Sequence, residues 1–380
     1  MCACSPPSCS AALPPSADPR PLLLVLPSLE AEGCPQLALL LARHWCRQGQ
    51  PLALLCLAPQ PAVLRPEFEA LAVPIHTLVL GSGPLRYPRL LARTFALCRA
   101  LRPRALLCFL FGWHALIALA ARLAGVPRLC AHVGNPPPSR QRRRMALLVQ
   151  LGRPFTHRLL CCSRSVARAC RRSYGLRRGE TRTVANACDL AQLLQLPPAR
   201  PAALPLLAMV ARLEAHKDHP TLLRALALLR DQGLIPRLWL IGDGSRRPQL
   251  EALIHTLGLS AQVQLLGSRR DIPQLLAQLD LFVFAAGPDE GFGIALAEAM
   301  AAGVPVVATA VPACRELLAG GRCGLLVPPA SPAALAAAIR AALADPAAAR
   351  RRAAAARRRA RRRYGVPAMA RAYGQELGLA

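Results

Sequence analysis

The feature that most constrains the fold is a regular alternation of short apolar runs with segments of helical length. Leu22 to Leu26, Leu52 to Leu57 and Ala105 to Phe111 have the length and composition of buried strands, and a helix-length segment follows the first and the third of them. Strands that alternate with helices predict a parallel sheet with helices on both faces. The alternation restarts at Leu206, so the sequence predicts an α/β protein with two doubly wound parallel-sheet halves in series.

Length and composition agree with this organisation. With 380 residues, 53% of them hydrophobic, the chain can form two domains with ordinary cores, which excludes a disordered protein. The first residues are rich in Pro, Ser and Cys and lack a basic start followed by an apolar core, so a disordered leader is predicted and not a signal peptide. The predicted parts are a leader at 1–20, a first domain at 21–195, a Pro-rich linker at 196–205, a second domain at 206–345 and a basic helical tail at 346–380.

The formal net charge of +28 raises nucleic acid, anionic lipid and anionic substrates as partners. Composition offers a second explanation, because Lys217 is the only lysine and Arg, Ala, Leu and Pro are abundant, as in a protein encoded by GC-rich DNA. The tail segment Arg350 to Arg363 alternates Arg triplets with Ala, which are both good helix formers. We predict a helix there with a solvated basic face, and binding of anionic lipid head groups is the alternative.

The fifteen cysteines form an odd number, include no Cys-x-x-Cys pair and lie mostly in apolar runs. Zinc ribbons, redox dithiols and disulfide frameworks are therefore not indicated, and buried thiols of a cytosolic protein are predicted.

One apolar segment has to be considered as a membrane span. Ala105 to Ala121 lies between arginines, but it is at the lower length limit for crossing a bilayer, and Gly112-Trp113-His114 interrupts it. A buried strand, a turn and an amphipathic helix explain the same residues, and this is the structure we predict.

The stretch from Pro288 to Thr309 concentrates residues with recognisable chemistry. Glu290 and Glu298 lie in an otherwise apolar segment, and ionised carboxylates are costly to bury without partners. Gly291 and Gly293 would let the backbone approach a ligand and direct N–H groups towards it. Without a ligand, the alternatives are a carboxylate favoured by a helix N-terminus for Glu290 and an exposed helix charge for Glu298.

Two cations follow the first strand of the second half. Arg212 and Lys217 can hold a diphosphate, with Arg as a planar fork and Lys as a point charge. In open α/β sheets, ligands bind beyond the carboxyl ends of the strands, where this loop lies. Internal pairing with Glu214 and Asp218 is the alternative. From the residues alone, the second half is predicted to bind an anion and a polyol.

Taken together, these motifs resemble those of the GT-B retaining glycosyltransferases of family 4. The resemblance rests on the Arg-x4-Lys loop at Arg212, the Gly242-Asp243-Gly244 turn, the Leu266-Gly267-Ser268 loop and the run from Glu290 to Val307. It covers the second half to about Ala344. It implies two Rossmann-like domains that face each other across a cleft, retention of the anomeric configuration, and no cofactor or obligatory metal; the sequence contains no Asp-x-Asp motif, which agrees.

The resemblance also implies roles for single residues. Arg212 and Lys217 would bind the diphosphate of the donor, Glu298 its ribose hydroxyls, and the loop Gly267 to Ile272 would pack around the base. Glu290 would hold the donor sugar together with the backbone of the next three residues. The residues implied to bind the donor are Gly33, Arg212, Lys217, Gly267, Ile272, Glu290, Gly291, Phe292, Gly293 and Glu298. The residues implied in catalysis, which includes stabilising the charge that grows on the leaving diphosphate, are Glu290, His132, Arg212 and Lys217.

The first half matches the family less well. The family usually has paired glycines in its first loop, whereas this chain has Glu32-Gly33-Cys34-Pro35, with one glycine and a proline that lacks an N–H. His132 corresponds to a histidine that orients the acceptor or the sugar in many members, and a packed histidine at a strand end is the alternative.

The resemblance leads to one functional hypothesis and two alternatives. We expect a hexosyltransferase that moves a sugar from a UDP- or GDP-sugar to a glycan or lipid-linked acceptor in cell-surface polysaccharide or glycolipid synthesis. It would act in the cytoplasm or peripherally at an anionic inner membrane face, and the sequence assigns no oligomeric state. A nucleotide-sugar epimerase, or less favourably a phosphorylase, would keep the fold. A nucleic-acid-binding protein ranks last, because aromatic residues make up only 4% of the chain and bases stack on aromatic side chains.

Overall fold

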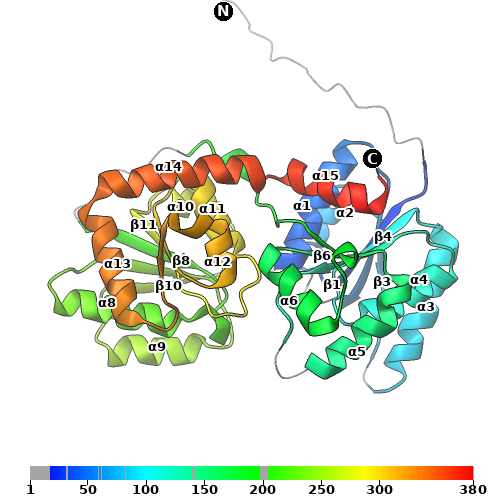
Figure 1. Ribbon diagram of the computed structural model, residues 1–380, viewed down its shortest axis with the longest axis horizontal. Helices are drawn as coiled ribbons and strands as arrows, with labels where there is room; N and C mark the ends of the chain where they lie inside the picture. Colours follow the sequence, from blue (N-terminus) through cyan, green and yellow to red (C-terminus); the bar gives the residue numbers. More distant parts are fainter. Residues whose placement is uncertain are drawn as a thin grey trace, which may run out of the picture. The chain divides into compact units, whose positions relative to one another are not determined.

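The fold is described from a computed structural model (Figure 1), which covers residues 18–30, 33–58, 60, 62–81, 83–138, 142–196 and 204–379. Most of the predicted leader 1–20, most of the predicted linker 196–205, and Glu32 lie outside these residues. The described residues form two compact units. Unit 1 comprises those within 1–132, 148–158 and 370–380, and unit 2 comprises those within 133–147 and 159–369.

The first sheet has seven strands in the order β3-β2-β1-β4-β5-β6-β7. These strands are β1 (Leu22–Ser28), β2 (Leu52–Ala58), β3 (Ile75–Thr77), β4 (Ala105–Cys108), β5 (Leu129–Val133), β6 (Arg158–Cys161) and β7 (Thr181–Thr183). β1 pairs in parallel with β2 on one side and β4 on the other, so that Leu22 lies opposite both Leu52 and Ala105. The first five residues of β1 are fully buried, as expected for a central parallel strand covered on both faces.

The second sheet has six strands in the order β10-β9-β8-β11-β12-β13 and lies in unit 2. These strands are β8 (Leu206–Val210), β9 (Arg237–Ile241), β10 (Val263–Gly267), β11 (Leu281–Phe284), β12 (Val306–Thr309) and β13 (Leu325–Val327). All of its paired strands are parallel. The prediction of two parallel-sheet α/β halves is confirmed.

Helices connect the strands, as the alternation of apolar runs predicts. The helices are α1 (Gly33–Arg47), α2 (Arg65–Glu69), α3 (Arg86–Leu101), α4 (His114–Leu123), α5 (Arg142–Gly152), α6 (Arg164–Tyr174), α7 (Leu190–Leu193), α8 (His219–Asp231), α9 (Arg247–Thr256), α10 (Ile272–Leu276), α11 (Ile294–Ala302), α12 (Pro312–Leu317), α13 (Pro332–Ala344), α14 (Pro346–Arg363) and α15 (Val366–Leu377). The short helices α2 and α7 were not predicted, because five or fewer residues carry too little periodicity to be recognised.

Each sheet contains one point where the chain changes the side on which it adds strands. In the first sheet this point lies between β1 and β4, and in the second it lies between β8 and β11. At such a switch point the two neighbouring loops leave in opposite directions, which creates a ligand site at the carboxyl ends of the strands. In unit 2 the loops concerned follow β8 and β11. The loop after β8 contains Lys217, and the loop after β11 contains Glu290.

The segment Ala105 to Ala121 forms β4, a turn and the start of α4, so the prediction of a strand and helix in place of a membrane span is confirmed. Among the described residues, no helix has the length and apolar character that a bilayer crossing requires. The twelve cysteines that the structure describes are free thiols and most are buried, which agrees with the predicted buried thiols. Burial raises the pKa of the Cys98 and Cys130 thiols to about 12.

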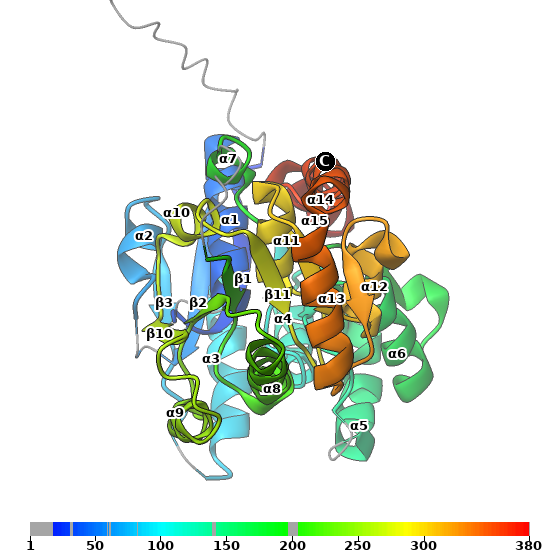
Figure 2. The same ribbon diagram turned by 90° about the vertical axis from the view of Figure 1, so that its left-hand side faces the viewer.

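The basic tail is a helix, as predicted, but the prediction of a simple solvated helix is incomplete. α14 buries a stripe of four alanines, and it packs against α11 and α13 (Figures 1 and 2). The buried alanines are Ala349, Ala353, Ala356 and Ala360. After α14 ends, the carbonyl of Tyr364 accepts a hydrogen bond from the Cys188 amide at 3.0 Å. The tail is therefore an integral part of unit 2 up to Met369.

Substitutions on α14 can test whether its alanine stripe is buried. Ala356→Glu would place a carboxylate on the buried stripe, so we expect it to lower the free energy of unfolding by about 3 kcal/mol. Ala354→Glu puts the same residue on the exposed face of the same helix, where a change within about 0.5 kcal/mol is expected. Urea unfolding followed by circular dichroism compares the two. Equal stability of the two variants would show that α14 is a free tail.

Candidate active site

The loop after β8, which belongs to unit 2, carries the two predicted cations. Arg212 is exposed, and Lys217 ends a short 3-10 helix, Ala215–Lys217. Glu214 is not the carboxylate to which Lys217 donates its hydrogen bond. Its carboxylate accepts hydrogen bonds from the Ser245 amide at 3.0 Å and the Ser245 hydroxyl at 2.9 Å, and these bonds lower its pKa. Glu214 therefore fixes the loop and leaves Lys217 to another carboxylate.

The Gly242-Asp243-Gly244 turn packs closely, backbone against backbone, on the loop after β8. A Cβ added to Gly242 would lie 2.1 Å from the Ala211 carbonyl oxygen, and one added to Gly244 would lie 2.7 Å from that of Leu213. The Leu213 amide in turn donates to the Asp243 carbonyl at 3.0 Å. These glycines are needed because only a residue without a side chain allows the two loops to approach so closely.

The loop after β11 is held by a buried hydroxyl that the sequence analysis assigned no role. Thr309, at the end of β12, is fully buried. Its Oγ1 accepts from the Ala286 amide at 2.9 Å and donates to the Ala286 carbonyl at 2.8 Å. One residue further on, the Gly287 amide donates to the His216 carbonyl at 2.8 Å, which joins this loop to the loop that carries Lys217.

The two loops meet in an ion pair between Lys217 and Glu290. The Lys217 Nζ donates to Glu290 Oε2, and the side chains are 15% and 7% exposed, respectively. Glu290 Oε1 also accepts from the Phe292 amide at 3.2 Å, and the Lys217 ammonium lies 5.3 Å from the centroid of the Phe284 ring. Each of the two charged groups is thus compensated by the other, and a second contact positions it. Neither alternative from the sequence, the pairing of Lys217 with Glu214 or with Asp218, is what the structure shows.

The Gly291 to Gly293 segment contains backbone that only glycine permits. A Cβ at Gly291 would lie 1.8 Å from the carbonyl oxygen of Gly134, in the loop after β5, and Gly293 has a φ of 91°. Between them Phe292 is buried and meets the Tyr364 ring edge-on, with the centroids 5.6 Å apart. The helix α11 begins immediately afterwards, so its free N–H groups lie next to Glu290 in the chain.

Two residues before α6 hold the carbonyl of Gly291, and the sequence analysis did not assign them to the site. The Ser163 hydroxyl donates to this carbonyl at 2.8 Å, and the Cys162 thiol lies 3.3 Å from it. Ser163 also caps α6 by accepting a hydrogen bond from the Val166 amide at 3.2 Å. In the sequence, Ser163 is recognisable only as a residue type that caps helices. Its second hydrogen bond joins residues 128 positions apart, which no local pattern shows.

Glu298 lies on α11 among buried apolar residues and is partly buried itself. Its carboxylate forms no hydrogen bond or ion pair with any residue that the structure describes. Loss of hydration raises its pKa to about 7, and it also lies close enough to Cys188 to raise the pKa of that thiol. The structure therefore excludes the alternative of a fully exposed helix charge, and a carboxylate without a protein partner is suited to accept hydrogen bonds from a ligand.

The predicted base-binding loop begins where β10 ends. Gly267 has a φ of 66°, and its carbonyl accepts from the Gly242 amide at 2.8 Å, so the ends of β10 and β9 are joined. Arg269 and Asp271 form an exposed ion pair of 2.6 Å, and Ile272, half-buried, begins α10. In the strand order, β9 lies between β10 and β8. The loop after β10 therefore lies at the same edge of the sheet as the loop that contains Lys217, two strands away.

His132 and Gly33 belong to unit 1. His132 is buried, its Nδ1 lies 2.7 Å from the Tyr373 hydroxyl, and its Nε2 has no partner among the described residues. Burial lowers its pKa to about 4, so the imidazole is neutral at neutral pH. It is a packed strand-end histidine, and a role towards the acceptor or the sugar stays a prediction.

Gly33 is the first residue of α1, at the carboxyl end of β1, and it is exposed. Pro35 lies in the first turn of α1, where a backbone N–H has no partner within the helix. The proline in the atypical loop is therefore compatible with the helix. Its effect on donor or acceptor binding stays a prediction.

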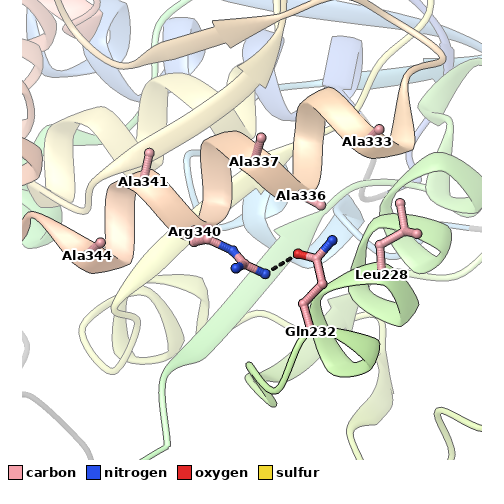
Figure 3. Close-up of a pocket in the computed structure, with 8 residues that line it drawn as sticks. All are labelled: Leu228, Gln232, Ala333, Ala336, Ala337, Arg340, Ala341 and Ala344. Carbon is pink, nitrogen blue, oxygen red and sulfur yellow. Dashed lines mark hydrogen bonds between the residues drawn. The ribbon is translucent and has the colours of Figure 1, made fainter.

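One surface pocket is separate from these residues. It has a volume of about 480 Å³ and lies between α8 and α13, with Gln232 and Arg340 hydrogen-bonded at its centre (Figure 3). Its other lining residues are mostly alanines of α13, and none is a predicted site residue. Among the described residues, no group of three or more His, Cys, Asp and Glu side chains is arranged to hold a metal ion. Independence of a metal stays a prediction.

Comparison with known proteins agrees with this geometry. A family model described as glycosyl transferases group 1 matches residues 198–359, and one described as glycosyltransferase family 4 matches residues 32–192. The lipopolysaccharide core biosynthesis glycosyltransferase LpsE of Rhizobium meliloti is 32% identical over 151 residues, which are 39% of this chain and 43% of LpsE. The putative glycosyltransferase EpsD of Bacillus subtilis is 34% identical over 131 residues, 34% of each chain. The match thus spans less than half the length of these relatives.

Solved structures show the same fold. HepE of Anabaena, in complex with UDP and glucose, superposes with a TM-score of 0.82 at 22% identity over 94% of this chain and 99% of HepE. WaaG, a glycosyltransferase involved in lipopolysaccharide biosynthesis, gives a TM-score of 0.73 at 18% identity over 93% of this chain and 99% of WaaG. The fold is GT-B. The two family models cover most of the chain, so it belongs to the group 1 glycosyltransferases, a family of enzymes.

The close approach at Gly291 can be tested by adding one methyl group. In Gly291→Ala the new Cβ would meet the backbone of Gly134, so we expect the free energy of unfolding to fall by about 3 kcal/mol. Gly287→Ala is the matched control, because its Cβ would lie an ordinary 3.4 Å from the His216 carbonyl oxygen. Thermal unfolding measures both. If the two variants melt at the same temperature, the loop does not pack as described.

The raised pKa of Glu298 predicts a pH dependence of stability. The unfolded carboxyl has a pKa near 4.5 and the folded one about 7, so folding is progressively opposed as pH rises between these values. Glu298→Gln removes this penalty. Its stability relative to the wild type should therefore increase by roughly 2–3 kcal/mol from pH 4 to pH 8 and level off above pH 7. Urea unfolding across this pH range measures the difference, with the exposed Glu251→Gln as control. A difference that does not change with pH would contradict the burial of Glu298.

Proposed function

We propose that this protein is a retaining glycosyltransferase that moves a sugar from a nucleotide-diphosphate sugar to a glycan or lipid-linked acceptor. The observation that carries the proposal is the Lys217–Glu290 ion pair at the β8/β11 switch point. It supports the proposal because a cation suited to a diphosphate lies next to a carboxylate suited to sugar hydroxyls, at the position where α/β sheets bind their ligands.

In this proposal the donor diphosphate binds the Lys217 ammonium and the Arg212 guanidinium. Lys217 has three N–H donors, so it can hold Glu290 and a phosphate oxygen at the same time. Arg212, exposed at the start of the loop, supplies a planar fork. When the glycosidic bond breaks, negative charge grows on the leaving nucleoside diphosphate. Two cations fixed beforehand stabilise that charge more than they stabilise the ground state.

The carboxylates take the hydroxyl groups of the donor. Glu298 has no partner among the described residues and is assigned the vicinal hydroxyls of the ribose, from which an ionised carboxylate can accept two hydrogen bonds. Glu290, oriented by Lys217 and the Phe292 amide, is assigned the sugar hydroxyls together with the backbone of Gly291 to Gly293. Neither assignment uses a metal ion or a cofactor.

The relatives indicate the class of donor and product. HepE was solved with UDP and with UDP-glucose, and LpsE is a lipopolysaccharide core biosynthesis enzyme. We therefore favour a UDP-sugar donor and a product in cell-surface polysaccharide or glycolipid. The proposal places the reaction in the cytoplasm or at the inner face of a membrane. An epimerase of the same fold would convert the donor without any acceptor, and incubation with UDP- and GDP-sugars alone separates the two activities.

Three substitutions test the assignment of the site. Lys217→Ala and Glu298→Ala should each weaken UDP or GDP binding about tenfold or more, because each removes a charged hydrogen-bond partner. Glu290→Gln should reduce turnover by more than it reduces nucleotide affinity, because Glu290 is assigned to the sugar. Calorimetry measures the affinity, and release of nucleoside diphosphate measures turnover.

The exposed Glu251→Ala serves as the matched control and should behave like the wild type. If Glu298→Ala changes neither binding nor turnover, the ribose assignment is wrong. A preceding thermal-shift screen with a panel of nucleotide sugars selects the donor, because a ligand of the native state raises the unfolding temperature.

A further inference from the structure

The helix α14 carries an unusual concentration of one charge. It contains nine arginines in three triplets and no acidic side chain. Asp345, which caps α14 by accepting from the Ala348 amide at 2.8 Å, is the only acidic residue between Pro332 and Arg363. The arginines therefore have no carboxylate partners along their own helix, and the site proposed above does not use them.

The arginines occupy distinct faces of the helix. The buried stripe of four alanines faces α11 and α13, and the opposite stripe presents Arg351, Arg358 and Arg362 to solvent. We call these three residues the arginine ridge. Their spacing of seven and four residues places them on one line along the helix, about 16 Å long at 1.5 Å per residue. Arg350 and Arg361, also exposed, flank the ridge on one side.

Other arginines of α14 have structural roles that the ridge does not share. Arg357 donates to the Leu194 carbonyl, and Arg359 donates to the carbonyls of Leu317 at 2.9 Å and Glu316 at 3.0 Å. These contacts fasten α14 to its neighbours. The ridge can therefore be changed without removing them.

The basic surface continues beyond the helix. Burial raises the pKa of the Cys323 thiol, and the nearby guanidinium groups of Arg359, Arg322 and Arg358 oppose this rise. Arg322 is exposed and lies outside α14, so the positive surface around Arg358 extends to a second segment of unit 2.

We propose that the arginine ridge docks unit 2 on an anionic lipid surface. Three guanidinium groups in a straight line on a convex helix fit a flat array of phosphate groups. After Pro346 at its first position, the exposed part of α14 contains only Ala besides Arg. Binding is therefore electrostatic, without insertion of apolar side chains. A single-stranded nucleic acid is disfavoured, because α14 has no aromatic side chain on which bases could stack. The proposal does not rest on glycosyl transfer.

The test is co-sedimentation of the full chain with vesicles of phosphatidylcholine, with or without phosphatidylglycerol. The wild type should bind only the vesicles that contain phosphatidylglycerol and should be released by high salt. Each arginine near an anionic surface contributes about fivefold, so the triple variant R351Q/R358Q/R362Q should bind on the order of 100-fold more weakly.

Two further variants make the result specific. R168Q/R172Q/R178Q removes the same charge from exposed positions elsewhere in unit 2 and should bind like the wild type. R351K/R358K/R362K keeps the charge and should retain binding, which shows that the positive charge of the ridge and not the shape of its side chains is required. The proposal is overturned if the ridge and control variants weaken binding equally, if neutral vesicles bind as well, or if single-stranded RNA displaces the protein from the vesicles at equal phosphate concentration.

Discussion

The ion pair between Lys217 and Glu290 is the interaction on which the candidate site depends. Two charges this deeply buried destabilise a fold unless each has a partner, and either residue alone would carry a large desolvation cost. The two residues lie 73 positions apart and reach each other only because β8 and β11 are neighbours in the sheet. The strand order therefore creates the site, and the pair fixes the ends of the two loops.

Around this pair the site is built from close backbone contacts and not from large side chains. Glycines at 242, 244 and 291 allow carbonyl groups to approach positions that a Cβ would occupy. Thr309 and Ser163 then hold the carbonyls and amides of the loop with buried hydroxyl groups. These contacts restrict the conformations of the loops, which suits a site in which charges must be in place before the ligand binds.

The two carboxylates of the Pro288–Thr309 stretch illustrate how far local sequence can be interpreted. Both were recognisable as unusual in an apolar segment, and both are buried or partly buried. The sequence could not show that Glu290 pairs with Lys217 while Glu298 has no partner in the part of the chain that the structure describes, because that depends on residues distant in the chain. In the same way the alternation of Arg and Ala in the tail predicted the helix α14. Only packing against α11 and α13 decided which face of it is exposed.

The sequence by itself determined the two parallel α/β halves, the positions of β1, β2 and β4 and of the helical tail, and the motif residues that mark the family. These properties follow from short-range periodicity and from residue types whose chemistry is local. The tertiary structure alone decided that Lys217 pairs with Glu290, that Ser163 and Thr309 support the loops, and that His132 is packed as a neutral imidazole against Tyr373. Burial and hydrogen-bond partners are set by which strands lie side by side, and that order is not encoded in any single segment.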